Sequence, residues 1–216
     1  MTYSKRDIIT SISLMIFIIT FIICLVLFCK WFYYYDASNL SLDKLTGLSM
    51  KTIKKNYDIL IRYQSIFYQG KLSFPNFKMS TTGRIHFEQV KVVCEVIQGL
   101  MVISGISSFI LVRKQHKEHK FMYLKLTAII TVVVPIVIGS LAAIDFDRAF
   151  TLFHQIVFQN NYWIFNSYSD PIINILPETF FMNSFIRIII LVIGSSLGLY
   201  LYYLRCLKNI KLEEKE

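Results

Sequence analysis

Cysteine is scarce in this chain, and its placement gives no basis for an extracellular disulfide framework. Cys24, Cys29, Cys94 and Cys206 all fall within or at the ends of long apolar runs, where small buried apolar side chains are the simpler interpretation. The sequence also lacks the Gly-x-Ser-x-Gly pattern of serine esterases and the His-Glu-x-x-His pattern of zinc proteases. A disulfide-stapled scaffold and two familiar hydrolase classes therefore have no support.

Acidic residues are also few: 14 Asp and Glu stand against 23 Lys and Arg, for a net charge of +9. In a soluble protein this excess would suggest a nucleic-acid partner. Here 55% of the residues are hydrophobic, and most of the basic residues can be assigned to the orientation of membrane helices. We therefore expect no nucleic-acid partner.

Long apolar runs dominate the sequence. A helix needs roughly 20 apolar residues to cross the hydrocarbon core of a bilayer. Runs of this kind predict an all-α, four-transmembrane-helix integral membrane protein, a single membrane domain over residues 1–216, with spans at about 8–29, 90–112, 121–144 and 185–204.

The loop between the second and third runs indicates the orientation. It holds four basic residues against Glu118 alone, and short basic loops stay in the cytoplasm. By helix parity both termini are then cytoplasmic, and two outer segments remain, at about 30–89 and 145–183. The segment 30–89 is itself basic, but it has about the length of 60 residues at which loop charge loses control of orientation. The basic residues of the short loop are Arg113, Lys114, Lys117 and Lys120.

In the first outer segment the sequence predicts an amphipathic helix, which Ser49 caps at its start and Gly70 ends. We interpret it as an extracellular helical cap. A loop that contains Pro75 and Gly83 would then lead to His86, at the outer end of the second span. The second outer segment reads as a continuation of the third span, over 145–158, that carries His154. The apolar stripe of the cap helix comprises Ile53, Tyr57, Leu60, Gln64 and Phe67.

The four histidines fall into two pairs. His116 and His119 lie in the cytoplasmic loop with only Glu118 as a nearby carboxylate, so no metal site is predicted. For His86 and His154, two interpretations remain open. Either each residue lies at the membrane interface, with the apolar part of its side chain buried and its polar end in water. Or the two imidazoles converge and transfer protons near neutral pH.

Charged residues near the spans are further candidates. Lys91 and Glu95 have the spacing of a helical ion pair and serve either the polarity of a site or the packing of the bundle. Arg187, near the outer end of the fourth span, either extends to the membrane surface or holds a phosphate or carbonyl group.

Two stretches resemble the bacterial lipoprotein intramolecular transacylases of Gram-positive bacteria, four-span membrane enzymes, and the resemblance covers essentially the whole chain. One is His-Phe-Glu-Gln-Val-Lys, residues 86–91. The other begins as Asp-Phe-Asp-Arg-Ala-Phe-Thr-Leu-Phe-His, residues 145–154, and continues through Asn160, Trp163 and Asp170-Pro171. The family pattern commonly has Asp where this chain has Gln89, Asn161 and Asn166.

The resemblance implies an acyltransferase of the bacterial cell membrane whose active site faces outside. It would move the sn-2 acyl chain of a diacylglyceryl-cysteine lipoprotein onto the lipoprotein's own α-amino group, giving the lyso form. Its partners would be the diacylated lipoprotein and membrane lipid, with no cofactor and no metal; the oligomeric state is not predicted. The catalytic residues would be His86 and His154. Beside them we expect substrate-binding or supporting residues at Lys91, Glu95, Asp145, Asp147, Asn160, Trp163 and Arg187.

Two other classes of function compete with this one. The main alternative is a non-enzymatic accessory or sensor subunit, in which the cap binds a partner and the histidines are incidental. A small transporter is disfavoured, because the spans carry few charges and show no paired broken segments in matching halves.

Overall fold

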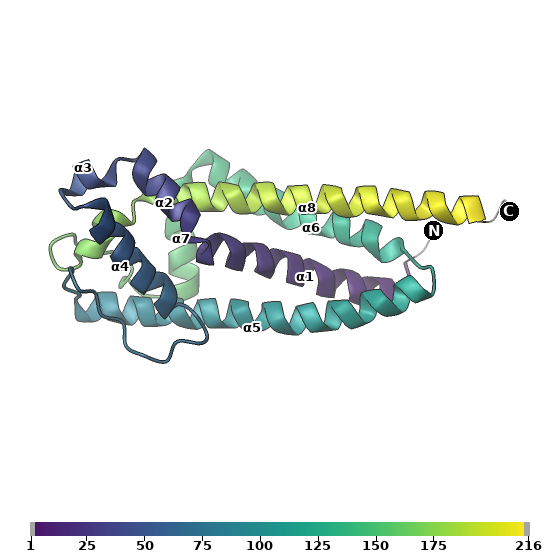
Figure 1. The fold of residues 1–216 in the computed structure, drawn as a ribbon, viewed down its shortest axis with the longest axis horizontal. Coiled ribbons are helices and arrows are strands. Elements are labelled where there is room, and N and C mark those ends of the chain that lie inside the picture. Colours follow the sequence, from purple (N-terminus) through teal and green to yellow (C-terminus); the bar gives the residue numbers. More distant parts are fainter. Residues whose placement is uncertain (1–2, 214–216) are drawn as a thin grey trace. The chain divides into compact units, whose positions relative to one another are not determined.

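The computed structural model describes residues 3–213, apart from the side chains of residues 134, 138, 141–143, 211 and 213. The described residues form helices and connecting loops without any strand (Figure 1). The all-α prediction is therefore confirmed. In chain order the helices are α1 Lys5–Phe28, α2 Lys30–Asn39, α3 Leu42–Thr46, α4 Met50–Tyr63, α5 Thr81–Lys117, α6 Met122–Ile144, α7 Phe146–Phe158, the short 3-10 helix η1 Pro171–Ile175, and α8 Glu178–Glu213.

The long apolar helices coincide with the four predicted runs. Within the described residues α1, α5 and α8 are long and apolar enough to cross a membrane, judged by length and composition. The apolar stretch found in α6, Met122–Val137, is shorter. Four crossings therefore stay a prediction.

The chain divides into two compact units, each assembled from segments distant in sequence. The first comprises residues 1–23, 98–140 and 188–216, that is, stretches of α1, α5, α6 and α8. Hydroxyl groups join these apolar helices. Ser11 Oγ donates to the carbonyl oxygen of Tyr123 at 3.0 Å, and Ser196 Oγ donates to that of Ala128 at 2.6 Å. Such small hydroxyl residues let apolar helices approach closely while keeping each polar group paired.

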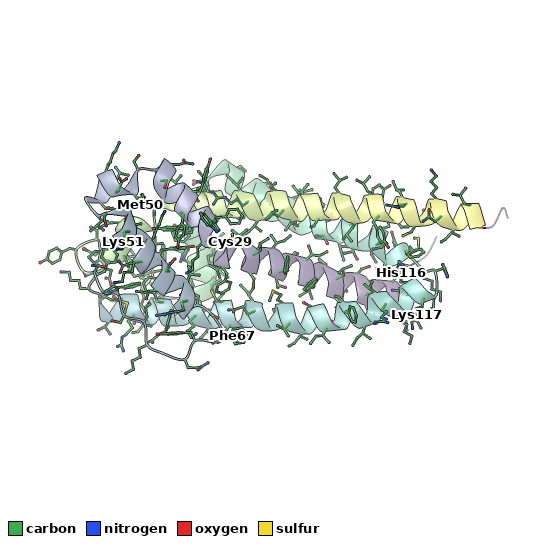
Figure 2. All side chains as sticks on the ribbon, viewed as in Figure 1. Cys29, Met50, Lys51, Phe67, His116 and Lys117 are labelled. Carbon is green, nitrogen blue, oxygen red and sulfur yellow. The ribbon has the colours of Figure 1, made fainter. Side chains whose placement is uncertain are left out.

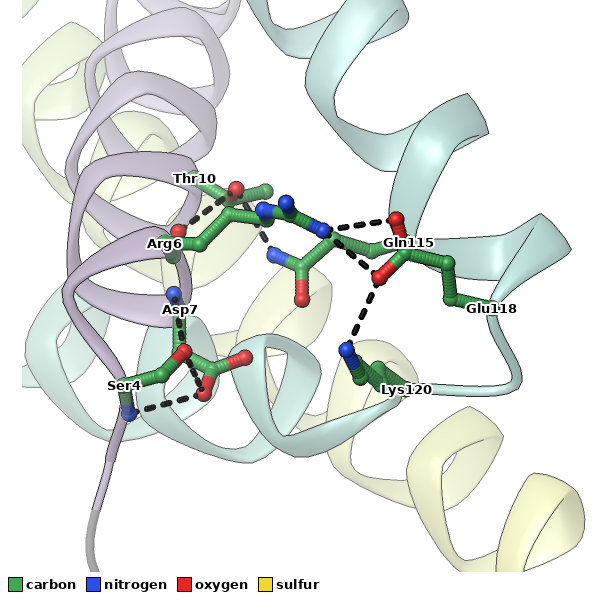
Figure 3. A network of polar contacts seen from close by, with 7 residues as sticks. All are labelled: Ser4, Arg6, Asp7, Thr10, Gln115, Glu118 and Lys120. Carbon is green, nitrogen blue, oxygen red and sulfur yellow. Dashed lines mark hydrogen bonds and ion pairs between the residues drawn. The ribbon is translucent and has the colours of Figure 1, made fainter.

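A polar network joins the start of α1 to the loop between α5 and α6 (Figure 3). Arg6 donates to both carboxylate oxygens of Glu118, at 2.7 and 2.6 Å, and Lys120 donates to the same carboxylate at 2.8 Å. These bonds from Lys120 and Arg6 lower the pKa of Glu118. Nearby, Gln115 Nε2 donates to Thr10 Oγ1 at 2.8 Å. The one acidic residue of this basic loop is thus occupied by two cations.

The second unit comprises residues 24–97 and 141–187 and contains every predicted site residue. At its core the rings of Tyr33 and Tyr57 are stacked with centroids 3.5 Å apart, and Phe180 meets both edge-on. Tyr33 also donates a hydrogen bond to the carbonyl oxygen of Ile175 at 2.7 Å. Burial raises the pKa of Tyr33, so its hydroxyl remains a donor. This core fixes α2, α4, η1 and the start of α8 to one another.

The cap helix α4 begins as predicted but ends early. Ser49 caps it, since its Oγ accepts a hydrogen bond from the backbone N–H of Thr52 at 3.2 Å. The predicted end at Gly70 is wrong: the helix stops at Tyr63, and Phe67 lies beyond it with 92% of its surface exposed. The physical reason is that three backbone carbonyls from Tyr63 onward bind a lysine of α5, described below, and do not continue the helical ladder.

Two further boundaries differ from the prediction. The predicted loop does not reach His86, because α5 already begins at Thr81 and includes Gly83 and His86. The stretch 145–158 is not a continuation of the third span. Asp145 has an extended backbone, and its Oδ1 accepts the backbone N–H of Arg148 at 2.9 Å. This N-cap starts a new helix, α7, which carries His154.

Candidate active site

His86 and His154 lie beside one another within the second unit. The first is in the second turn of α5 and the second is near the middle of α7. Their ring centroids are 6.0 Å apart, with the ring planes at 35°. Only 5% and 8% of the two residues are exposed. The convergence that the functional interpretation requires is therefore present, and neither imidazole is an exposed interfacial tip.

A backbone carbonyl fixes one nitrogen of His154. Its Nδ1 lies 2.7 Å from the carbonyl oxygen of Phe150, one turn earlier in α7. Because a carbonyl can only accept, Nδ1 is the donor and Nε2 is left to exchange a proton. The rings of Phe150 and Trp163 enclose the imidazole, at centroid distances of 4.1 and 4.8 Å. Burial lowers the pKa of His154, while the bond to Phe150 acts in the opposite direction.

His86 has a different environment. Its ring meets those of Phe158 and Phe165 edge-on, at 4.8 and 5.4 Å. Its Nδ1 is enclosed and has no hydrogen-bond partner among the described residues. Protonation of this nitrogen would place an unpaired N–H in apolar surroundings, at a cost of about 1–3 kcal/mol or more for a charged group. The site therefore favours a neutral His86 that carries its proton on Nε2.

Asp170 holds the start of the helix that carries His86. Its Oδ1 accepts the backbone N–H of Ser80 at 2.7 Å, and Ser80 Oγ accepts the N–H of Gly83 at 3.0 Å. Only 2% of Asp170 is exposed. A Cβ atom on Gly83 would collide with Oδ1 of Asp170 and come within 3.0 Å of the Phe165 ring. Asp170 therefore positions the first turn of α5, immediately before the histidine.

Asn160 joins the loop after α7 to α5. Its Nδ2 donates to Gln89 Oε1 at 3.2 Å and to the carbonyl oxygen of Phe158 at 2.7 Å. Its own carbonyl oxygen accepts the indole N–H of Trp163 at 2.9 Å. The loop thus places an aromatic ring on His154 and ties it to the helix of His86. Gln89, at a position where the family pattern commonly has Asp, keeps a partner here.

Comparison with known proteins identifies the family. Residues 8–181 match the family model described as lipoprotein intramolecular transacylase Lit. The chain belongs to the Lit family. A search of curated proteins found no match.

Solved structures of a Lit protein resemble the whole chain. The membrane integral Lit from Bacillus cereus is 35% identical, with a TM-score of 0.93 and 96% of each chain covered. Two variants of the same protein, with one histidine replaced by arginine or by alanine, are each 34% identical with a TM-score of 0.87. They cover 96% of this chain, and the matches cover 93% and 94% of theirs. Lit proteins are lipoprotein intramolecular transacylases, so the family is one of membrane-integral acyltransferases.

Lys91, one of the predicted supporting residues, binds other groups of the protein with its whole ammonium. Its Nζ donates to the carbonyl oxygens of Tyr63, Ser65 and Tyr68 at 2.9, 3.1 and 2.9 Å. It also pairs with Glu95 at 2.9 Å, in the predicted helical spacing. This geometry favours the packing interpretation over site polarity, and it leaves the ammonium no free proton for a substrate.

Arg187 is likewise occupied, by a partner that the sequence did not indicate. Its guanidinium donates two bonds of 2.6 Å to the carboxylate of Asp36, which is 2% exposed. Asn183 Nδ2 donates to the same carboxylate at 3.0 Å. The charge of Arg187 is therefore paired within the protein, with the carboxylate of Asp36. Asp36 was missed, although a lone carboxylate in the aromatic stretch after the first span signals a buried charge that needs a partner.

Asp145 and Asp147 are not brought to the histidine pair. Both are exposed, and Asp145 serves as the N-cap of α7. Asp147 forms no ion pair or hydrogen bond with the residues the structure describes, and it lies in the first turn of α7, where negative charge favours the helix. The site that the structure assembles around His86 and His154 thus includes Asn160 and Trp163 from the predicted set.

Proposed function

We propose that this Lit-family chain is a membrane acyltransferase that works at the paired imidazoles of His86 and His154. The observation that carries the proposal is the 6.0 Å separation of two buried histidine rings from different helices. Buried histidines whose nitrogens are not all committed to the protein are suited to proton transfer near neutral pH. The solved relatives with a single histidine replaced agree with a histidine-centred site.

The substrate would be a lipoprotein whose N-terminal cysteine carries a diacylglyceryl thioether and a free α-amino group. The neutral amine attacks the carbonyl carbon of the sn-2 ester, so that a C–N bond forms and the C–O bond to the glyceryl oxygen breaks. The amine loses one proton, and the glyceryl oxygen gains one. Because amine and ester belong to one molecule, correct positioning supplies effective molarities on the order of 10⁵ M or more.

The contacts of the two rings favour different roles. We assign proton transfer to His154, whose Nδ1–H stays bonded to Phe150 whether the ring is neutral or cationic. Its Nε2 would take the proton from the attacking amine and return it to the departing glyceryl oxygen. His86, neutral because its Nδ1 is enclosed, would donate a hydrogen bond from Nε2 to the ester oxygen as negative charge develops.

The topology predicted from sequence belongs to the same proposal. Both termini would lie in the cytoplasm, four helices would cross the bilayer, and the second unit would face outside. The basic loop 113–120 supports this orientation, because its cations outnumber Glu118, which Arg6 and Lys120 already occupy.

The test is expression in a host that lacks the activity, followed by mass spectrometry of lipoprotein N-termini. The unmodified chain should convert diacylated lipoproteins to the lyso form. His86→Gln and His154→Gln should each lose this product by roughly 10² to 10⁴-fold, at unchanged protein level. The control is His119→Asn, since His119 is exposed, lies in the first unit and has a left-handed backbone (φ 51°) that asparagine tolerates.

Unchanged lyso product in both histidine variants would contradict the proposed site. No lyso product even from the unmodified chain would contradict the enzyme and favour an accessory or sensor subunit.

A further inference from the structure

A basic groove lies on the face of α4 that points away from the core of the second unit. Residues of α4 at three- and four-residue spacing line it, together with Lys30 at the start of α2. The opposite face of α4, with Ile53, Tyr57 and Leu60, is buried in the core. The groove has a volume of about 830 Å³ and is lined by Lys30, Met50, Lys51, Lys54, Lys55, Asp58, Ile59 and Arg62.

Five cationic side chains line this groove against one carboxylate. The single acidic residue, Asp58, is already engaged: Lys30 lies 3.3 Å from it, and the hydroxyl of Tyr34 donates to it at 2.6 Å. Lys51 and Lys55 are exposed, and neither forms an ion pair with any residue that the structure describes. Figure 2 shows Lys51 and Met50 together where α4 begins. The groove therefore presents uncompensated cations beside apolar side chains.

The chain places this groove at the boundary of a membrane helix. Lys30 follows α1, one of the long apolar helices, after one intervening residue. On the same helix as Lys30, Trp31 and Tyr35 are 77% and 64% exposed. Exposed Trp and Tyr at the end of an apolar helix are typical of the membrane–water interface. A ligand in the groove would thus lie at the level of lipid headgroups.

We propose that this groove binds the phosphate headgroup of an anionic membrane glycerophospholipid. Lysine and arginine side chains hold the phosphate oxygens, as clusters of basic residues at a membrane surface do. Met50 and Ile59 contact the glycerol and the first carbons of the acyl chains. The site is separate from the histidine pair, and the lipoprotein substrate has no phosphate in its diacylglyceryl group. The proposal therefore does not rest on the proposed function.

Native mass spectrometry of the full chain in a neutral detergent tests this site. Short-chain phosphatidylglycerol and phosphatidylcholine are titrated separately, and the bound fraction is measured for each. We expect phosphatidylglycerol to bind about tenfold more tightly, because each Lys or Arg near an anionic headgroup contributes measurably. The double variant Lys51→Ala, Lys55→Ala should remove this preference. Inorganic phosphate at the same concentration should not displace the lipid.

The matched control is Lys44→Ala, Lys71→Ala, two exposed lysines of the same unit that do not line the groove. It should keep the preference. Arg62→Gln gives an independent variant of the groove and should weaken phosphatidylglycerol binding alone. Equal binding of the two lipids, or an unchanged preference in the Lys51 and Lys55 variant, would overturn the proposal. Displacement by inorganic phosphate would contradict the assignment to a lipid.

Discussion

The carbonyl oxygen of Phe150 lies 2.7 Å from Nδ1 of His154. Both residues are on α7, one helical turn apart, so the helix itself supplies the acceptor. Since a carbonyl oxygen carries no proton to give, the proton stays on Nδ1 in both charge states of the ring. Nε2 is therefore the nitrogen through which His154 gains and loses a proton.

The pH dependence of acyl transfer follows from this assignment. Burial lowers the pKa of His154 from its ordinary value of about 6.5, so the ring stays neutral into mildly acidic solution. The substrate's α-amino group titrates near 8 and must also be neutral. The logarithm of the single-turnover rate should therefore rise with a slope of one from about pH 6.5 to about 8, with a slope of two only at lower pH.

The control for this profile is His154→Gln, whose residual activity should show the amine ionisation alone. A slope of two that already appears near pH 7 would contradict the lowered pKa.

Gly83→Ala should lower activity while leaving the protein folded. The added methyl collides with Oδ1 of Asp170, which caps the start of α5 next to His86. Displacement of a reacting group by about 1 Å can cost on the order of 10²-fold in rate. The measurement is the rate of lyso-lipoprotein formation by purified enzyme. Gly99→Ala is the control, since a Cβ on this glycine of the same helix meets nothing within 4 Å. Equal rates of lyso-lipoprotein formation in the two variants would contradict the prediction.

Removal of Arg187 should destabilise the protein more than removal of its partner's charge. Arg187→Met leaves the carboxylate of Asp36 buried at 2% exposure with only Asn183 beside it. A buried charge that loses its partner costs about 3–5 kcal/mol. Asp36→Asn should cost less, and the double variant should recover part of the loss of Arg187→Met. The free energy of unfolding in detergent is the quantity to measure.

The comparison for that pair is Lys30→Met. Lys30 and Asp58 lie 3.3 Å apart, but their side chains are 41% and 35% exposed, so the loss should be about 0–1 kcal/mol. If Lys30→Met and Arg187→Met lower the free energy of unfolding equally, burial of the Asp36 pair adds nothing to the stability.

Lys91→Met should loosen the turn that follows α4. The ammonium holds three backbone carbonyls of residues 63–68, and bonds of this charged kind contribute about 1.5–3 kcal/mol each. Hydrogen exchange in residues 64–70 should accelerate by at least tenfold. Glu95→Gln removes only the ion pair and should leave this exchange nearly unchanged. If exchange responds to Glu95→Gln and not to Lys91→Met, the carbonyl contacts are not what orders the turn.

Local patterns in the sequence predicted the features that depend on neighbouring residues. The apolar runs became the long helices, Ser49 capped α4, and Lys91 and Glu95 paired at helical spacing. Each of these follows from interactions within a few residues. The same reasoning failed at the end of α4, where the deciding contact is a lysine 23 to 28 residues away in the chain.

The candidate site shows the same limit. His86 and His154 were identified, but their separate roles depend on the Phe150 carbonyl and on the enclosure of one nitrogen, which no spacing predicts. Asp36 and Arg187 are 151 residues apart, so neither pattern nor propensity could pair them. Asp170 lay within a motif of the family resemblance, yet its role at the start of α5 is visible only in three dimensions.

The group that orients His154 belongs to the main chain. Every amino acid at position 150 would supply the same carbonyl oxygen, so substitution of Phe150 changes the packing around the imidazole and leaves its proton on the same nitrogen. Sequence changes at this position can therefore alter the shape of the surroundings of His154 without altering the tautomer of its imidazole.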